Sequence, residues 1–157
     1  MMGDYIIQRW VKPEDDSRRP MHSAKSRVPG PAQKKSAVGI LLVDDQSDLR
    51  SLLRRALELE GYSVWEAGNG QEALEIAEAE GNRIHLLLTD LRMPGMDGYE
   101  LARELTRRRP DIVVLYMSGY SENLPPPGVP FLQKPFRLDT LKREIARLLQ
   151  SNRRAAG

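Results

Sequence analysis

The stretch GILLVDD at residues 39–45 places two aspartates directly after a short run of aliphatic residues. Runs of this kind, in which no polar residue alternates with the apolar ones, are typical of strands buried on both faces of a parallel sheet. Three further runs end in a similar way: IHLLLT leads to Asp90, IVVLYM to Ser118 and VPFLQ to Lys134. Because the carboxyl ends of parallel strands share one edge of a sheet, where ligands bind, we expect these polar residues to converge on one site.

Segments with helical periodicity alternate with the apolar runs. We expect strands at 40–43, 62–66, 84–89, 112–117 and 129–133, and helices at 47–60, about 69–81, 98–109 and 138–149. Strands joined by helix-length segments imply right-handed crossovers. The sequence therefore predicts an α/β fold, a doubly wound five-stranded parallel sheet with helices on both faces.

The fourth crossover is an exception, because only sixteen positions separate Ser118 from Lys134. Its sequence GYSENLPPPG, residues 119–128, contains three consecutive prolines, which cannot lie inside a helix. We expect the helix of this crossover to be short or absent, with at most one turn around Ser121 to Leu124 and extended chain after it.

The chain of 157 residues is long enough for one domain and a tail. Residues 1–36 hold eight basic and four acidic residues and are rich in Pro and Ser from Lys12 onward, so we expect a disordered basic tail. The apolar stretch DYIIQRWV inside it is either an unstructured leader or a docking segment. We place the folded domain at 37–150 and a disordered C-terminus at 151–157.

Composition also limits the partners and the location. The remaining 16 basic and 18 acidic residues leave the folded part mildly acidic, so we expect no nucleic-acid binding by this domain. The chain has no cysteine, no apolar stretch of transmembrane length and no stretch like a signal peptide. This pattern predicts a cytoplasmic protein that does not bind membranes.

Asp44, Asp45 and Asp90 would bring three carboxylates into one pocket. Like charges at close range disfavour one another, so such a cluster favours a bound cation, and an all-oxygen set of ligands is typical of Mg²⁺. The alternative is that two of these aspartates only cap helices or turns. Ser118 and Lys134 add a hydroxyl and an ammonium that can contact phosphoryl oxygens, which leaves Asp90, on the expected central strand, as the nucleophile.

The segments LLVDD, LLLTDLRMPGMDG, VLYMSGY and FLQKPF resemble the receiver domain of two-component response regulators, over about residues 37–149. The resemblance implies a flavodoxin-like sheet of the receiver type. It also implies that Asp90 is the phospho-acceptor, and that Asp44, Asp45 and Asp90 bind Mg²⁺ together with the backbone carbonyl of Arg92.

The same resemblance assigns a conformational switch. It implies that Ser118 and Lys134 form the switch pair, that Phe131 is an aromatic switch residue, and that the peptide bond before Pro135 is cis. The alternative for Phe131 is an ordinary core aromatic on the last strand. The short fourth crossover departs from the family and resembles receivers at the C-terminus of hybrid histidine kinases.

The expected function is phosphorelay signal transduction, in which a histidine kinase or a histidine phosphotransfer domain donates the phosphoryl group. We expect no turnover enzyme beyond the chain's own phosphorylation and dephosphorylation, and we expect a monomer. Two alternatives stay open. One is a Mg²⁺-dependent aspartyl-phosphate phosphatase, although in that class the acidic pair after the first strand is spaced differently from Asp44 and Asp45. The other is a vestigial pseudo-receiver that acts as an interaction module.

Overall fold

The structure is a computed structural model that describes residues 37–120, 122 and 124–157. The expected disordered tail at residues 1–36, with its apolar stretch, lies outside the described residues. The expected helical turn around Ser121 lies partly outside them.

Strands and helices alternate along the described chain in the predicted order. The strands are β1 (Gly39–Val43), β2 (Ser63–Ala67), β3 (Ile84–Asp90), β4 (Val113–Ser118) and β5 (Phe131–Gln133). The helices are α2 (Ser47–Leu59), α3 (Gly70–Glu80), the short 3₁₀-helix η4 (Gly81–Arg83), α4 (Gly98–Arg108) and α5 (Leu138–Ala156). The strands form one parallel sheet in the order β2-β1-β3-β4-β5, which confirms the predicted doubly wound fold and puts β3 at the centre.

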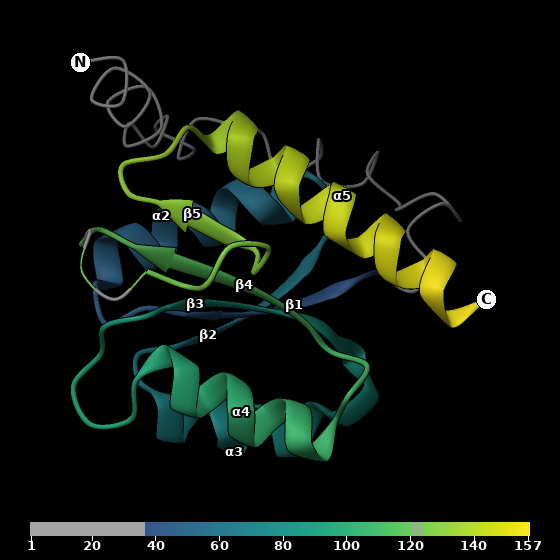
Figure 1. Cartoon of the computed structure of the whole chain (residues 1–157), viewed down its shortest axis with the longest axis horizontal. Helices are drawn as coiled ribbons and strands as arrows, with labels where there is room; N and C mark the ends of the chain where they lie inside the picture. Colours follow the sequence, from purple (N-terminus) through teal and green to yellow (C-terminus); the bar gives the residue numbers. More distant parts are fainter. Residues whose placement is uncertain (1–36, 121, 123) are drawn as a thin grey trace, which may run out of the picture. The chain divides into compact units, whose positions relative to one another are not determined.

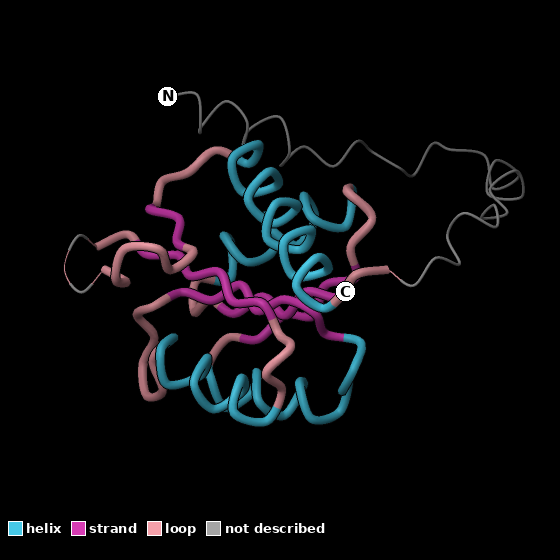
Figure 2. Tube along the Cα trace, turned by 45° about the vertical axis from the view of Figure 1, so that its right-hand side comes forward, coloured by secondary structure: helices cyan, strands magenta, loops and turns pink. Residues whose placement is uncertain are grey.

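Helices cover both faces of the sheet, α2 and α5 on one side and α3 and α4 on the other (Figures 1 and 2). Successive side chains of a strand point to opposite faces, and β1 divides its residues accordingly. Ile40 and Leu42 pack with residues of α2 and α5, whereas Leu41 and Val43 pack with residues of α3 and α4. This double burial explains why the strands have continuous apolar sequences.

The loop before α4 is fixed by a capping box. The Asp97 carboxylate accepts a hydrogen bond from the Glu100 N–H at 2.8 Å, and the Glu100 carboxylate accepts one from the Asp97 N–H at 2.9 Å. These bonds satisfy two N–H groups that a helix start leaves free. The loop that follows Asp90 therefore has a defined end.

The fourth crossover, between β4 and β5, contains no helix at residues 119–120, 122 and 124–130, the part of it that is described. The prediction that its helix is short or absent is therefore confirmed there. Residues 129 and 130, which we expected in a strand, precede β5, so that β5 has only three residues.

The last helix corrects one expectation. α5 continues to Ala156, so the prediction that residues 151–157 are disordered is wrong as far as Ala156. No glycine or proline lies between Leu138 and Gly157, and the Asn152 side chain donates a hydrogen bond to the backbone oxygen of Asp111 at 3.2 Å. No helix in the described ranges is long and apolar enough to cross a membrane.

Gly98 lets α4 approach the end of β3, and this contact gives a first prediction. A Cβ at Gly98 would overlap the backbone oxygen of Asp90. We expect Gly98→Ala to lower the free energy of unfolding by about 1–3 kcal/mol, because overlap with backbone cannot be relieved by a rotamer change. Urea denaturation measures this. In the control Gly119→Ala, the new Cβ would meet Lys134 Cβ at an ordinary 3.8 Å; an equal loss in both variants would contradict the overlap.

Candidate functional site

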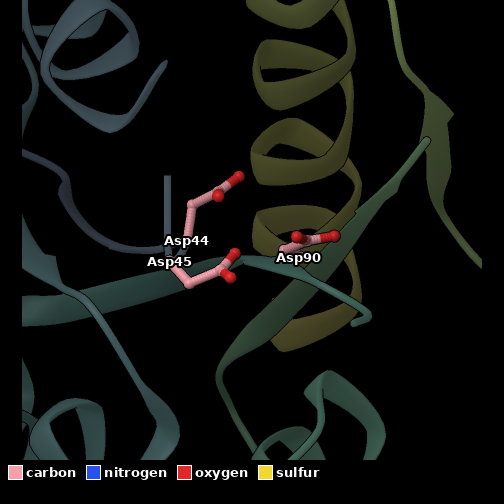
Figure 3. Close-up of side chains that lie close together, drawn as sticks. All are labelled: Asp44, Asp45 and Asp90. Atoms are coloured by element: carbon pink, nitrogen blue, oxygen red, sulfur yellow. The ribbon is translucent and has the colours of Figure 1, made fainter. Parts of the chain in front are cut away.

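The three aspartates meet at the carboxyl ends of two neighbouring strands. Asp44 and Asp45 follow β1, and Asp90 is the last residue of β3, which pairs with β1. One carboxylate oxygen from each lies within 4.8 Å of the others. Figure 3 shows Asp44 and Asp45 extending from the same stretch of chain toward Asp90. Asp44 is fully buried, Asp90 is 7% exposed, and Asp45 is exposed, so the cluster opens to solvent on the Asp45 side.

Lys134 supplies a positive charge to this cluster. Its Nζ lies 2.8 Å from Asp44 Oδ2 and 3.5 Å from Asp90 Oδ2. The Lys134 backbone N–H donates to the Ser118 backbone oxygen at 2.8 Å, which ties the two strand ends together. The bond between Lys134 and Pro135 is cis. The ammonium therefore offsets part of the repulsion between the carboxylates.

Burial raises the pKa of the Asp90 carboxyl above its ordinary value. The main cause is loss of solvation; the charge of Lys134 and a hydrogen bond from the Arg92 backbone lower the pKa, while the charge of Asp44 raises it further. A buried carboxylate with little hydration is a better nucleophile than one surrounded by water. The negative charge of Asp90 is thus poorly solvated, and Lys134 compensates it only in part.

Ser118 and Arg92 border a hollow of about 670 Å³ beside Asp90, which Leu91, Tyr99 and Glu122 also line. Ser118 is 2% exposed, and its hydroxyl oxygen accepts a hydrogen bond from the Tyr120 N–H at 3.2 Å. The Arg92 guanidinium stacks on the Tyr120 ring at 4.6 Å from its centre. Arg92, which lines the hollow, is therefore held by a cation–π contact with Tyr120.

Phe131 lies on β5, half-buried, in register with Tyr116 of β4. Neither hydrophobic core includes it, in contrast to its neighbour Leu132. The alternative of an ordinary core aromatic therefore has little support.

Arg50 is a site residue that the sequence reasoning missed. From α2 it donates a hydrogen bond to the backbone oxygen of Asp44 at 2.6 Å and another to Glu66 Oε1 on β2 at 3.2 Å. The only signal in the sequence was a basic residue beside the apolar face of the helix, with Arg54 four residues later. Basic residues on helices usually face solvent, so this signal was too weak to use.

The donor atoms of the cluster suit a hard cation. Carboxylate oxygens of Asp44, Asp45 and Asp90, an open side toward solvent and no nitrogen or sulfur donor among the clustered groups agree with Mg²⁺, which keeps several of its waters. Asp44 already accepts hydrogen bonds from Lys134 and from the Gln46 N–H at 2.9 Å. The exposed Asp45 carboxylate, which accepts no hydrogen bond among the described residues, therefore has more free lone pairs for a cation. The expected role of the Arg92 backbone carbonyl as a ligand of Mg²⁺ stays a prediction.

Comparison with known proteins gives a consistent result. A family model described as the response regulator receiver domain matches residues 40–146. The response regulator receiver protein CpdR of Brucella abortus (strain 2308) is 40% identical over 116 residues, which are 70% of this chain and 95% of CpdR. The sensor kinase CckA of the same organism is 36% identical over 151 residues, which are 92% of this chain but only 16% of CckA.

Solved structures agree with these relatives. The crystal structure of the receiver domain from the hybrid histidine kinase CckA is 39% identical, with a TM-score of 0.63, and the match covers 71% of this chain and 98% of that one. The response regulator TrrA from Thermotoga maritima, solved in complex with Mg²⁺ and BeF, is 33% identical with the same TM-score and the same coverage of both chains.

The raised pKa of Asp90 predicts an effect on stability. The folded protein binds the Asp90 proton more tightly than the unfolded chain, so the stability of wild type falls as pH rises from the ordinary carboxyl pKa to the raised one. Asp90→Asn removes this loss. In the presence of a chelator at neutral pH we expect it to raise the melting temperature by roughly 2–4 °C, the shift that about 1 kcal/mol gives at this size.

The melting temperatures of both proteins, measured against pH, test this expectation. The advantage of Asp90→Asn should vanish at acid pH, where both states of wild type carry the proton. Asp44→Asn is the control, because Asp44 accepts two hydrogen bonds that an amide cannot fully replace, and it should lower the melting temperature. An advantage that does not change with pH would contradict the role of the buried charge.

Proposed function

The chain belongs to the response regulator receiver domain family, and on this premise we propose that Asp90 accepts a phosphoryl group from a partner phosphohistidine in a reaction that requires Mg²⁺. The chain acts as a signalling module of a two-component system. The observation that carries the proposal is the placement of Asp90, nearly buried at the end of the central strand, with two carboxylates and one ammonium beside it.

The step is a transfer between two nucleophiles. An Asp90 carboxylate oxygen attacks phosphorus while the bond from phosphorus to the imidazole nitrogen breaks. The electron pair of that bond returns to the imidazole, and the product is an acyl phosphate on Asp90. Catalysis of such a transfer depends mostly on positioning and on neutralising charge.

Two side chains of this chain can meet the incoming phosphoryl oxygens. The Lys134 ammonium is close to Asp90 already, 3.5 Å from its Oδ2. The Ser118 hydroxyl is engaged with Tyr120 and can exchange that weak local bond for a stronger one to a charged oxygen. Mg²⁺, when bound by Asp44, Asp45 and Asp90, supplies the remaining neutralisation of charge.

The same exchange gives a switch. When Ser118 turns to the phosphoryl group, it leaves the space near the β4–β5 loop, and we propose that Phe131 turns inward to fill it. The half-buried position of Phe131, outside both cores, supports this role because the ring is not held by core packing. Two packings of similar energy are what a switch of this kind requires.

The proposed donor is a histidine kinase or a histidine phosphotransfer domain. A location in the cytoplasm, a monomeric state and independence from nucleic acids and membranes stay predictions. The aspartyl-phosphate phosphatase is the second candidate from the enzyme class, and the pseudo-receiver is the third. The set of three aspartates with a lysine speaks against a vestigial site, because such a costly cluster has no structural use.

Mass spectrometry after incubation with acetyl phosphate tests the proposal. We expect wild type to gain one phosphoryl group with Mg²⁺ and none with a chelator, and Asp90→Asn to gain none. Asp97→Asn is the matched control, because Asp97 lines the same hollow but caps α4, a role that asparagine also fills; it should be labelled like wild type. Absence of labelling in wild type would favour the pseudo-receiver, and repeated release of phosphate from an ester would favour the phosphatase.

The lifetime of the phosphorylated protein gives a second test. Arg92 and Tyr120 stack beside the site and should limit the access of water to the acyl phosphate. We expect Tyr120→Ala to shorten the half-life of phospho-Asp90 several-fold, measured by loss of the added mass over time. Leu124→Ala is the control, since Leu124 is an exposed residue of the same crossover. A wild-type half-life of seconds, or an equal effect of both variants, would contradict this shielding.

A further inference from the structure

Arg50 holds the backbone of the acidic cluster. Its Nη1–H donates to the Asp44 carbonyl oxygen at 2.6 Å, and its Nε–H donates to Glu66 Oε1 at 3.2 Å. One guanidinium therefore connects three elements, α2, β2 and the end of β1. The Arg50 side chain is 19% exposed, so solvent weakens these contacts only in part.

The carbonyl that Arg50 holds belongs to the peptide between Asp44 and Asp45. The other polar groups of Asp44 are already engaged, because its N–H donates to the Ala67 oxygen at 3.2 Å and its two carboxylate oxygens accept from Gln46 and Lys134. In the described part of the chain, the exposed Asp45 carboxylate accepts no hydrogen bond. The direction of the Asp45 side chain thus depends on the orientation of this peptide.

Charge alone would make Arg50 harmful to cation binding. A positively charged guanidinium close to the cluster repels Mg²⁺. Glu66 pairs with the Nε of Arg50, while Nη1 donates to the Asp44 backbone oxygen, and the Glu66 carboxylate offsets the charge of Arg50. Arg54 Nε also lies 2.8 Å from Glu66 Oε2, an ion pair in which, among the described residues, the N–H finds no hydrogen-bond acceptor. The arrangement gives Arg50 a geometric role with a reduced electrostatic cost.

We propose that Arg50, oriented by Glu66, is a positioning residue that fixes the Asp44–Asp45 peptide and thereby aims the Asp45 carboxylate at Mg²⁺. The inference rests on the proposed function, since it presupposes a Mg²⁺ site at the cluster. Groups that orient metal ligands without touching the metal typically change affinity 10–100-fold when they are removed.

Calorimetric titration of the full-length protein with Mg²⁺ tests the inference. We expect Arg50→Gln and Arg50→Lys each to weaken Mg²⁺ binding about tenfold or more. Lysine keeps the positive charge but cannot hold a carbonyl and a carboxylate from one rigid plane. Arg50→Gln distinguishes a role in charge from a role in positioning. Removal of a repelling charge would strengthen Mg²⁺ binding, whereas loss of positioning would weaken it.

Arg109 offers a matched control near the amino end of β3, opposite the acidic cluster at its carboxyl end. It donates to the backbone oxygens of Gly81 at 2.6 Å and Ile84 at 3.2 Å and pairs with Asp111 at 2.7 Å, near the start of β3. Arg109→Gln removes a bridge of the same kind from the end of the strand that is remote from the cluster. We expect Arg109→Gln and the Arg50 variants all to lower the melting temperature, because each loses a bridge between elements, and Arg109→Gln to leave the Mg²⁺ affinity unchanged.

The outcomes separate the inference from its premise. Wild-type binding of Mg²⁺ with unchanged or stronger binding by Arg50→Gln overturns the inference alone, as does equal weakening by Arg109→Gln. Failure of the wild-type protein to bind Mg²⁺ overturns the proposed function together with the inference. Arg50→Lys decides the matter if Arg50→Gln does not fold, because it retains the charge and most of the side-chain volume.

Discussion

The repulsion among three carboxylates at the end of β1 and β3 is the constraint on which the rest of the site depends. Their oxygens lie within 4.8 Å of one another, and two of the three residues are buried or nearly so. Such a cluster destabilises a fold unless positive charge compensates it. Lys134 provides one compensating charge from the residue after β5, the last strand of the chain. The sheet order, the buried ends of the strands and the tie between Lys134 and Ser118 all serve to bring that ammonium to the aspartates.

Most of the fold followed from the sequence because a parallel sheet covered on both faces requires continuous apolar strands and helix-length connections. The site at the strand ends could be predicted equally well, since the parallel topology alone brings their polar residues to one edge of the sheet. The extent of α5 could not be predicted, because the choice between helix and coil at 150–156 depends on weak propensities and on contacts such as that of Asn152 with the Asp111 backbone. Arg50 was missed for a related reason: its partner is a backbone carbonyl, and backbone groups leave no mark in a sequence.

The fourth crossover lies beside the proposed switch residues and contributes no residue to the acidic cluster. The aspartates and Lys134 lie at the ends of β1, β3 and β5 and come together although the described residues between β4 and β5 contain no helix. What changes is the neighbourhood of Ser118 and Phe131, where a proline-rich segment stands in place of a packed helix. A phosphoryl-dependent movement of these two residues would thus reach a surface made of loop and of α4.

The small size of β5 has a kinetic meaning. This strand has three residues at the edge of the sheet and pairs only with β4. Strands with few backbone hydrogen bonds and one neighbour open locally at a lower free energy than central strands, so the amides of β5 should exchange with solvent before those of β3. Because Lys134 follows β5 directly, such an opening would remove the restraint that holds the ammonium beside the aspartates. The charge balance of the site would then depend on the strand with the fewest residues in the sheet.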